Sequence, residues 1–213
     1  VADFQIDRQL DIAEGETACS EGLAISPTQA AMCASEFQRT TTFLRGLHDA
    51  IADAVVLKSP DPVRVLYAGS GPYATLAVPL MTVFPPEKVR FTVLDMHAVS
   101  IESAKSVVSR LGLDRSVESY VLADACKYTI PGDAIPDILL CETMSTALER
   151  EPQVAIMRHL LGQAPDAVIV PESVRVDAFL VDTSKEPVFI VPESEDPSAK
   201  WQPDRIPVGP VFE

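Results

Sequence analysis

Residues 63–72 read VRVLYAGSGP, an apolar stretch that runs directly into a turn containing two glycines. The apolar, β-branched run predicts a buried strand. Glycines after a strand let the chain reverse tightly and let a ligand approach the backbone, although an ordinary tight turn would look the same. No Lys-Ser or Lys-Thr pair comes directly after the glycines, so the turn does not match a phosphate-binding P-loop.

Further apolar stretches alternate with stretches of helical periodicity along the rest of the chain. This alternation predicts an α/β fold with a doubly wound, mostly parallel sheet, whose ligands bind beyond the carboxyl ends of the strands. Gly112 and Gly162 are predicted to end helices. The predicted strands are 63–68, 91–95, 119–123, 137–141, 167–171 and 174–181, and the predicted helices are 73–84, 98–111 and 149–162.

An N-terminal helical segment precedes the first strand. Ser26-Pro27-Thr28-Gln29 combines an N-cap serine, a proline at the first helical position and a capping-box glutamine, which predicts a helix start. Apolar residues at helical spacing extend the helical layer to about residue 56, with an expected break near Gly46. The Ser59-Pro60-Asp61-Pro62 stretch then ends it.

Composition and charge limit the classes of partner. Seventeen Lys and Arg face 31 Asp and Glu, a formal net charge of -14, so the chain repels a phosphate backbone and we expect no nucleic-acid partner. An acidic surface suits a cationic partner such as an Arg-containing peptide, but it also serves solubility alone.

Cysteine, histidine and hydropathy patterns indicate a cytoplasmic protein with reduced thiols and without a metal. The four cysteines show no CxxC spacing, and the histidines, His97 among them, are isolated from one another. No apolar run is long enough to cross a bilayer, so we expect no membrane partner.

Two acids fall at the ends of successive predicted strands. Asp95 ends the second strand, where a carboxylate can accept hydrogen bonds from both ribose hydroxyls. Asp124 follows the third strand and can receive an adenine amino group, while the small Ala125 leaves room for the ring. Either acid alone also fits an ordinary loop carboxylate. Their joint placement beside the glycine turn favours a nucleoside site.

This ordered set resembles the class I S-adenosylmethionine-dependent methyltransferases over about residues 60–171. The resemblance implies that Gly69 and Gly71 lie beneath the methionine part of S-adenosyl-L-methionine, while the two acids hold its ribose and adenine. It departs from the common pattern at Tyr67, where an acid is usual. Ala74 stands where a dehydrogenase turn has a small third residue, so a nicotinamide enzyme stays open.

Two glutamates follow the fourth strand. Glu142 comes directly after it and Glu151 nine positions later, so both carboxylates can clamp a guanidinium in bidentate fashion. Glu151, with Glu149, also fits the acid preference of a helix's first turn. The spacing is similar to the double-glutamate loop of the protein arginine methyltransferases. Arg39, in the stretch FQRTTTF, is similar to that family's basic residue that holds the cofactor carboxylate, although a lone helical arginine is usually a solvated charge.

The glycine turn with Pro72, together with Asp124-Ala125, most resembles the symmetric-dimethylating branch of that family. We therefore expect methyl transfer from S-adenosyl-L-methionine to a nitrogen nucleophile, such as a guanidinium on a small molecule or an Arg-containing peptide. A small-molecule methyltransferase of biosynthetic metabolism and a non-catalytic pseudo-methyltransferase binding domain stay open, as does a homodimer. The expected catalytic residues are Glu142 and Glu151, and the expected cofactor-binding residues are Arg39, Gly69, Gly71, Asp95, Asp124 and Ala125.

These expectations divide the chain into three parts. Residues 1–58 are predicted to form the helical segment that caps the cofactor site, and residues 59–182 the Rossmann-like domain that binds S-adenosyl-L-methionine. Residues 183–213 are crowded with proline and acidic residues, which predicts a tail or the start of an incomplete C-terminal module.

Overall fold

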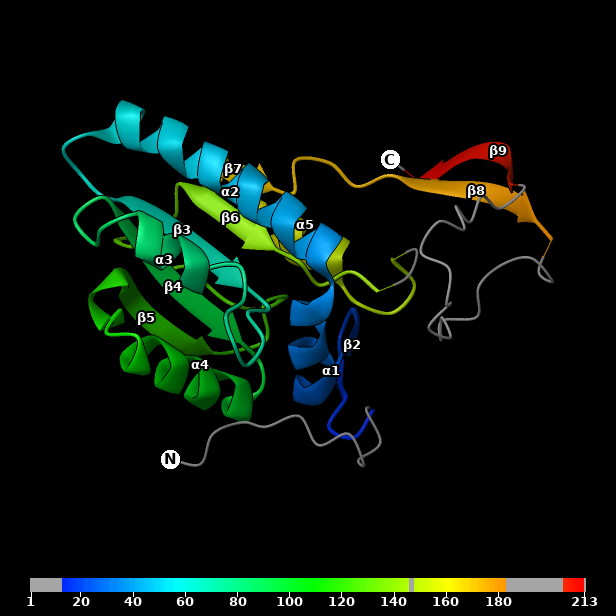
Figure 1. The fold of residues 1–213 in the computed structure, drawn as a ribbon, viewed down its shortest axis with the longest axis horizontal. Coiled ribbons are helices and arrows are strands. Elements are labelled where there is room, and N and C mark those ends of the chain that lie inside the picture. Colours follow the sequence, from blue (N-terminus) through cyan, green and yellow to red (C-terminus); the bar gives the residue numbers. More distant parts are fainter. Residues whose placement is uncertain (1–12, 146–147, 183–204, 213) are drawn as a thin grey trace, which may run out of the picture. The chain divides into compact units, whose positions relative to one another are not determined.

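The computed structural model describes residues 13–145, 148–182 and 205–212. Its centre is a five-stranded parallel sheet in the order β5-β4-β3-β6-β7 (Figure 1). This order confirms the predicted doubly wound, Rossmann-like α/β sheet. The strands are β3 (Val63–Ala68), β4 (Val89–Asp95), β5 (Val117–Leu122), β6 (Ile138–Cys141) and β7 (Val168–Val170).

The direction of winding reverses between β3 and β6. From β3 the chain proceeds to β4 and β5 on one side, and then returns to add β6 and β7 on the other. In open α/β sheets, ligands bind beyond the carboxyl ends of the strands at such a switch point. Ala68, the last residue of β3, lies opposite Leu94 of β4 and Cys141 of β6, so the three strands end at nearly the same level.

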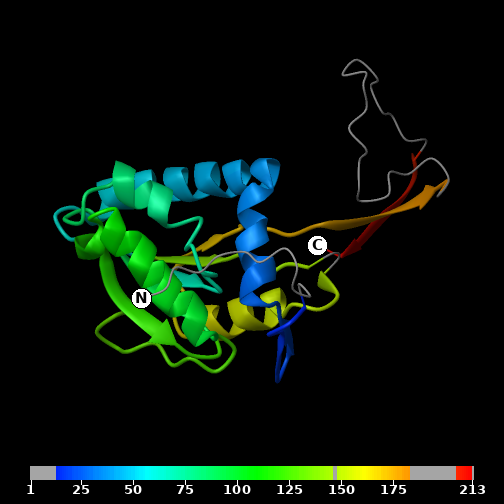
Figure 2. The ribbon, with the colours of Figure 1, turned by 60° about the horizontal axis from the view of Figure 1, so that its bottom comes forward.

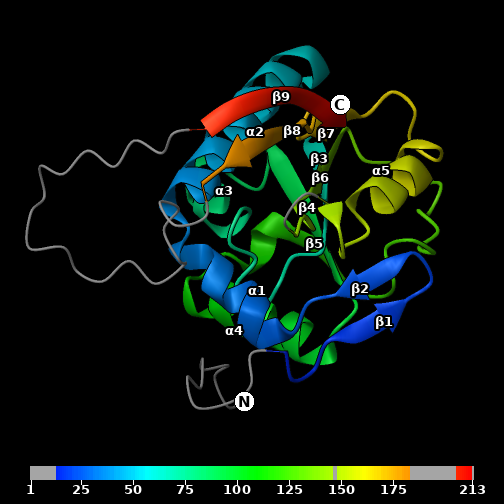
Figure 3. The same cartoon turned by 90° about the vertical axis from the view of Figure 1, so that its right-hand side faces the viewer.

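Helices cover both faces of the sheet and create two hydrophobic cores. One core joins α2 (Phe37–Lys58), α3 (Val78–Val83) and α4 (Ala98–Arg110) to one face, and the other joins α5 (Gln153–Leu161) to the opposite face. Figure 3 shows α5 on the other side of the sheet from these three helices. Burial on both faces explains why the central strands are continuously apolar rather than alternating.

The N-terminal part begins with a hairpin, β1 (Thr17–Cys19) and β2 (Gly22–Ala24), followed by α1 (Pro27–Met32). The helix start is confirmed, because the Ser26 hydroxyl accepts a hydrogen bond from the backbone N–H of Gln29 at 3.0 Å. A short 3₁₀ turn, η1 (Cys33–Ser35), then connects α1 to α2.

The predicted break near Gly46 is wrong, because α2 runs through this residue without interruption. The chain changes direction earlier, between α1 and α2, as Figure 2 shows. Glycine costs a helix only about 1 kcal/mol, which the packing of Leu47 and Ile51 against the sheet offsets. The sequence signal at Gly46 was therefore weaker than the apolar stripe around it.

Two helices are shorter than predicted. The first begins only at Val78, because Ala74 adopts a left-handed φ of 44° that interrupts helical geometry. The last begins at Gln153 instead of residue 149. The two glycines predicted to end helices are confirmed, since α4 ends shortly before Gly112 and α5 ends directly before Gly162.

The chain forms two compact units, Val1–Glu172 and Ser173–Glu213. In the second unit, β8 (Val176–Val181), which was predicted, pairs with β9 (Arg205–Phe212) in antiparallel fashion. The remainder of the predicted tail, residues 183–204 and 213, lies outside the described residues. Among the described helices, none combines the length and the apolar character needed to cross a bilayer.

Candidate functional site

One cavity lies at the carboxyl edge of the sheet, within the first unit. Residues of β3, β4 and α2 and of the segments that follow β5 and β6 line it, and Cys19, Ala24 and Ile25 from the hairpin region add to the lining. All eight residues predicted from the sequence are among the lining residues. They are Arg39, Gly69, Gly71, Asp95, Asp124, Ala125, Glu142 and Glu151.

The glycine turn follows β3 and requires glycine for two reasons. Gly69 and Gly71 have φ values of +73° and +64°, in the left-handed region that other residues rarely adopt. A Cβ at Gly69 would also collide with the methyl group of Thr143, which follows β6. The backbone N–H of Gly69 donates to the Leu94 carbonyl at 2.9 Å, which ties the turn to the neighbouring strand β4.

Asp95 is fixed beneath this turn. It is 6% exposed. One carboxylate oxygen accepts a hydrogen bond from the Gly71 N–H at 2.9 Å, and the other accepts from the His97 N–H at 2.8 Å. Each carboxylate oxygen has two lone pairs, so both retain capacity for a ligand hydroxyl. Asp95 therefore holds the turn in place and still offers acceptors to the cavity.

Asp124 and Ala125 lie beyond the end of β5. One Asp124 oxygen accepts from the Cys126 N–H at 2.9 Å, and the other lies 3.6 Å from the exposed Lys127 ammonium. Ala125 is buried in the core beneath α5. Asp124 thus shapes its own loop, as an ordinary loop carboxylate would, and also lines the cavity.

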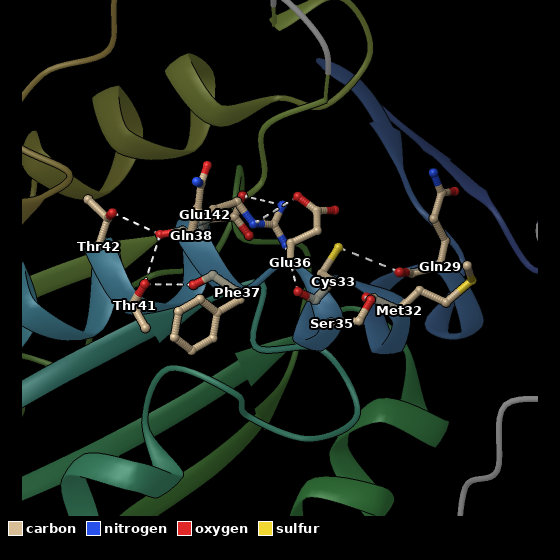
Figure 4. A network of polar contacts seen from close by, with 11 residues as sticks. Gln29, Met32, Cys33, Ser35, Glu36, Phe37, Gln38, Thr41, Thr42 and Glu142 are labelled. Carbon is tan, nitrogen blue, oxygen red and sulfur yellow. Dashed lines mark hydrogen bonds and ion pairs between the residues drawn. The ribbon is translucent and has the colours of Figure 1, made fainter. Parts of the chain in front are cut away.

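Arg39 reaches from α2 to the acidic side of the cavity. Its guanidinium lies 3.0 Å from a Glu142 oxygen and 3.6 Å from a Glu36 oxygen, and it donates to the Cys33 carbonyl at 3.4 Å. Glu36 and Glu142 face this guanidinium from α2's N-cap and the end of β6, respectively (Figure 4). Arg39 is therefore a partly buried, paired cation rather than a solvated surface charge.

The two glutamates share an environment that disfavours their ionised forms. Burial raises the pKa of Glu142 to about 7; Arg39 opposes this rise, and the nearby Glu151 adds to it. Burial likewise raises the pKa of Glu151 to about 7, against the lowering effects of Arg39 and Arg150. Glu151 precedes α5 and is not in its first turn, so a macrodipole role in the helix does not explain its position. A cation entering the cavity would favour ionisation of both carboxyls.

Gln153, at the start of α5, was not predicted as a site residue. Its side chain is almost fully buried and accepts from the backbone N–H of Thr143 while donating to the Cys141 carbonyl, each at 3.0 Å. These bonds fix the backbone on both sides of Glu142. A glutamine in a helix carries no sequence signal for such a role, which depends on where the helix is docked.

His97 and the hairpin were also missed. The ring Nε2 of His97 lies 3.0 Å from the Thr17 hydroxyl, and Nδ1 lies 3.4 Å from an Asp95 oxygen. On the opposite side, the Arg150 carbonyl accepts from the Leu23 N–H at 2.9 Å. The hairpin therefore connects the Asp95 wall of the cavity to the segment that carries Glu151. Partners so distant along the chain leave no pattern in a single sequence.

Comparison with known proteins gives partial matches to solved structures only. No protein-family model matches the chain, and no protein of curated function matches it in sequence. Magnesium protoporphyrin IX methyltransferase from Synechocystis, with S-adenosylmethionine bound, is similar at a TM-score of 0.45 and 15% identity over 65% of this chain and 58% of that one.

Two further solved structures are similar over about half of this chain. A human methyltransferase 10 domain containing protein matches at a TM-score of 0.43 and 16% identity, covering 58% of this chain and 55% of that one. The [4+2]-cyclase SpnF matches at a TM-score of 0.41 and 23% identity, covering 54% of this chain and 39% of that one. The chain thus spans less than two thirds of the length of each of these structures, and similarity at this level does not identify a reaction.

Proposed function

We propose that the protein is an S-adenosyl-L-methionine-dependent methyltransferase that acts on a nitrogen nucleophile, with a guanidinium as the preferred acceptor. The observation that carries this proposal is the placement of a partly buried acid pair, Glu142 and Glu151, in the same cavity as the glycine turn, Asp95 and Asp124. The residues suited to bind a nucleoside and those suited to bind a cation then line the same cavity.

The donor end of the cavity fits an adenosyl amino acid. Gly69 and Gly71 line the cavity, and glycines in such a turn let a ligand approach the backbone closely. Asp95 keeps free acceptor capacity for ribose hydroxyls, and Asp124 beside Ala125 offers an acceptor for an adenine amino group. When bound there, the cofactor would supply a methyl group activated by a positively charged sulfur.

The acceptor end fits a planar cation. Two carboxylates can hold a guanidinium through paired hydrogen bonds and aim one nitrogen, so that alignment supplies much of the rate. A nitrogen that gains a methyl group must lose a proton. Burial raises the pKa values of Glu142 and Glu151, whereas a bound cation favours their ionised forms, so either carboxylate can accept that proton once the acceptor is bound.

The test combines binding with turnover. We expect S-adenosylhomocysteine to bind the wild-type protein in calorimetry, and an arginine-containing peptide to accept a radiolabelled methyl group. Glu142→Gln should keep S-adenosylhomocysteine binding within about threefold, yet lower methyl transfer by about 100-fold or more, because it removes an interaction made mainly to the acceptor.

Contrary outcomes point to the alternatives. Binding of a nicotinamide dinucleotide in place of S-adenosylhomocysteine would contradict the donor assignment. Binding of S-adenosylhomocysteine without transfer to any guanidine compound would favour a non-catalytic binding domain.

A small-molecule acceptor is the second candidate. The observation that favours it is the hairpin region, whose Cys19, Ala24 and Ile25 line the cavity and occupy space that a peptide would need. Transfer to free arginine or a related small guanidine, but not to peptides, would select this candidate.

A further inference from the structure

Tyr67 is a buried residue that lines the cavity. It is the second-last residue of β3 and pairs in register with Val93 of β4 and Leu140 of β6, so the strand fixes it between both neighbours. The residue is 3% exposed, and its ring packs in the core shared with α2. It also lines the cavity, two positions before Gly69.

The Tyr67 hydroxyl lacks a protein partner within the described part of the chain. Among the described residues, every side-chain oxygen that is fully enclosed has a hydrogen-bond partner. The Tyr67 hydroxyl forms no hydrogen bond with a described residue, so its oxygen is not fully enclosed. The hydroxyl oxygen therefore reaches the cavity surface. A hydroxyl that faces the cavity without a protein partner can bond with a ligand that enters it.

The surroundings of Tyr67 indicate which ligand group it meets. Burial raises the pKa of the Tyr67 hydroxyl well above its usual range, and the charge of Glu142 raises it further, so the group keeps its proton and can donate. Arg39 lies close enough to act on the same hydroxyl electrostatically. Arg39 is also the one Lys or Arg among the described residues that line this cavity. An anionic ligand group would therefore find its cationic partner at Arg39, beside Tyr67, where it competes with Glu142 and Glu36 for the guanidinium.

We propose that Tyr67 is a cofactor-binding residue, which donates a hydrogen bond to the carboxylate at the amino-acid end of the methyl donor and shares that carboxylate with Arg39. The inference rests on the proposed function, because it assumes a donor that carries an amino-acid end. The carboxylate accepts from both the phenol and the guanidinium, and the ammonium group of the same ligand is left to the acidic residues.

The experiment removes one oxygen atom from the protein and one carboxylate from the ligand. Calorimetry compares wild type with Tyr67→Phe, using S-adenosylhomocysteine and its decarboxylated analogue, which keeps the adenosine, the sulfur and the amine. We expect Tyr67→Phe to weaken S-adenosylhomocysteine binding by about tenfold, as for loss of a hydrogen bond to a charged group, and to leave the analogue within about twofold.

The matched control is Tyr120→Phe, which removes the same atom from β5 outside the cavity lining and should change neither affinity. Equal binding of S-adenosylhomocysteine to wild type and Tyr67→Phe would overturn the inference while leaving the proposed function intact. An equal loss for both ligands would overturn the carboxylate assignment. Failure of S-adenosylhomocysteine to bind wild type would instead overturn the proposed function, and the inference with it.

Discussion

The glycine turn and the glutamate segment line the same cavity but are held by different kinds of interaction. The turn is fixed by its own backbone conformation and by bonds to β4, the strand beside it. Glu142 and Arg150 are instead held by contacts from distant parts of the chain: the Arg39 guanidinium pairs with Glu142, and the backbone N–H of Leu23 in the hairpin donates to the Arg150 carbonyl. A site can therefore combine one wall set by local chain geometry with another set by tertiary packing, and the two should respond differently to substitution.

The largest expected effect is at the turn. Gly69→Ala should lower the free energy of unfolding by roughly 3–4 kcal/mol, because an alanine is strained at a left-handed φ and its methyl group would overlap that of Thr143. Urea denaturation measures the change. Gly46→Ala is the matched control: α2 has open space there, so the same substitution should stabilise by about 0.5–1 kcal/mol. Equal effects at both positions would contradict the turn geometry described above.

The next largest effect on stability is expected at Gln153, which holds the backbone on both sides of Glu142. Gln153→Leu should lower the free energy of unfolding by about 2–3 kcal/mol, since it leaves the Cys141 carbonyl and the Thr143 N–H without partners. Gln163→Leu, which also removes side-chain bonds to backbone groups but lies outside the cavity lining, serves as a comparison. Only Gln153→Leu should also reduce methyl transfer, so an unchanged rate would show that Glu142 does not depend on this support.

The acid pair gives a pH dependence of stability. The pKa values of Glu142 and Glu151 rise from 4.5 to about 7 on folding, so the native state binds more protons than the unfolded state between these values. The contribution of these groups is then fully present below about pH 4.5 and is lost as the pH rises through about 7. Thermal unfolding of the Glu142→Gln/Glu151→Gln variant should lack this fall. A wild-type profile of the same shape as the variant's would contradict the raised pKa values of the two glutamates.

The smallest expected effect concerns the ion pair between Arg150 and Glu16, which lie 2.8 Å apart. Glu16→Gln should change the free energy of unfolding by less than about 1 kcal/mol, because the arginine is about half exposed. It should nevertheless weaken S-adenosylhomocysteine binding a few-fold by loosening the hairpin. Glu87→Gln removes a comparable surface pair with Arg115, far from the cavity lining, and should leave binding unchanged.

The predictable parts of the molecule are those that depend on neighbouring residues. Apolar runs and the glycines and polar residues that end them predict the strand ends, the glycine turn and Asp95. Because the strands are parallel, these features were predicted at one edge of the sheet. The sequence also pointed to Glu142 through its position after a strand. It could not reveal that Arg39 pairs with Glu142, because the two residues are brought together by the docking of α2. The same limit hid Gln153, whose role exists only in the packed structure.

The errors in the predicted helices have a similar origin. Gly46 looks like a breaker in isolation, yet the neighbouring Leu47 and Ile51 are fully buried against the sheet and keep the helix continuous. Conversely, the left-handed residue Ala74 is an alanine, a good helix former, and its sequence environment gave no warning of the turn. Tertiary packing outweighed local propensity in both places.

We expect the hairpin at Thr17–Ala24 to limit how fast the cavity exchanges its contents. It joins His97 on one wall to Arg150 on the other, so widening the mouth requires that one of these attachments break. We expect the residence time of a bound molecule to follow the opening rate of two short strands, and not only the strength of the molecule's own bonds. Ligands of very different affinity would then leave at similar rates.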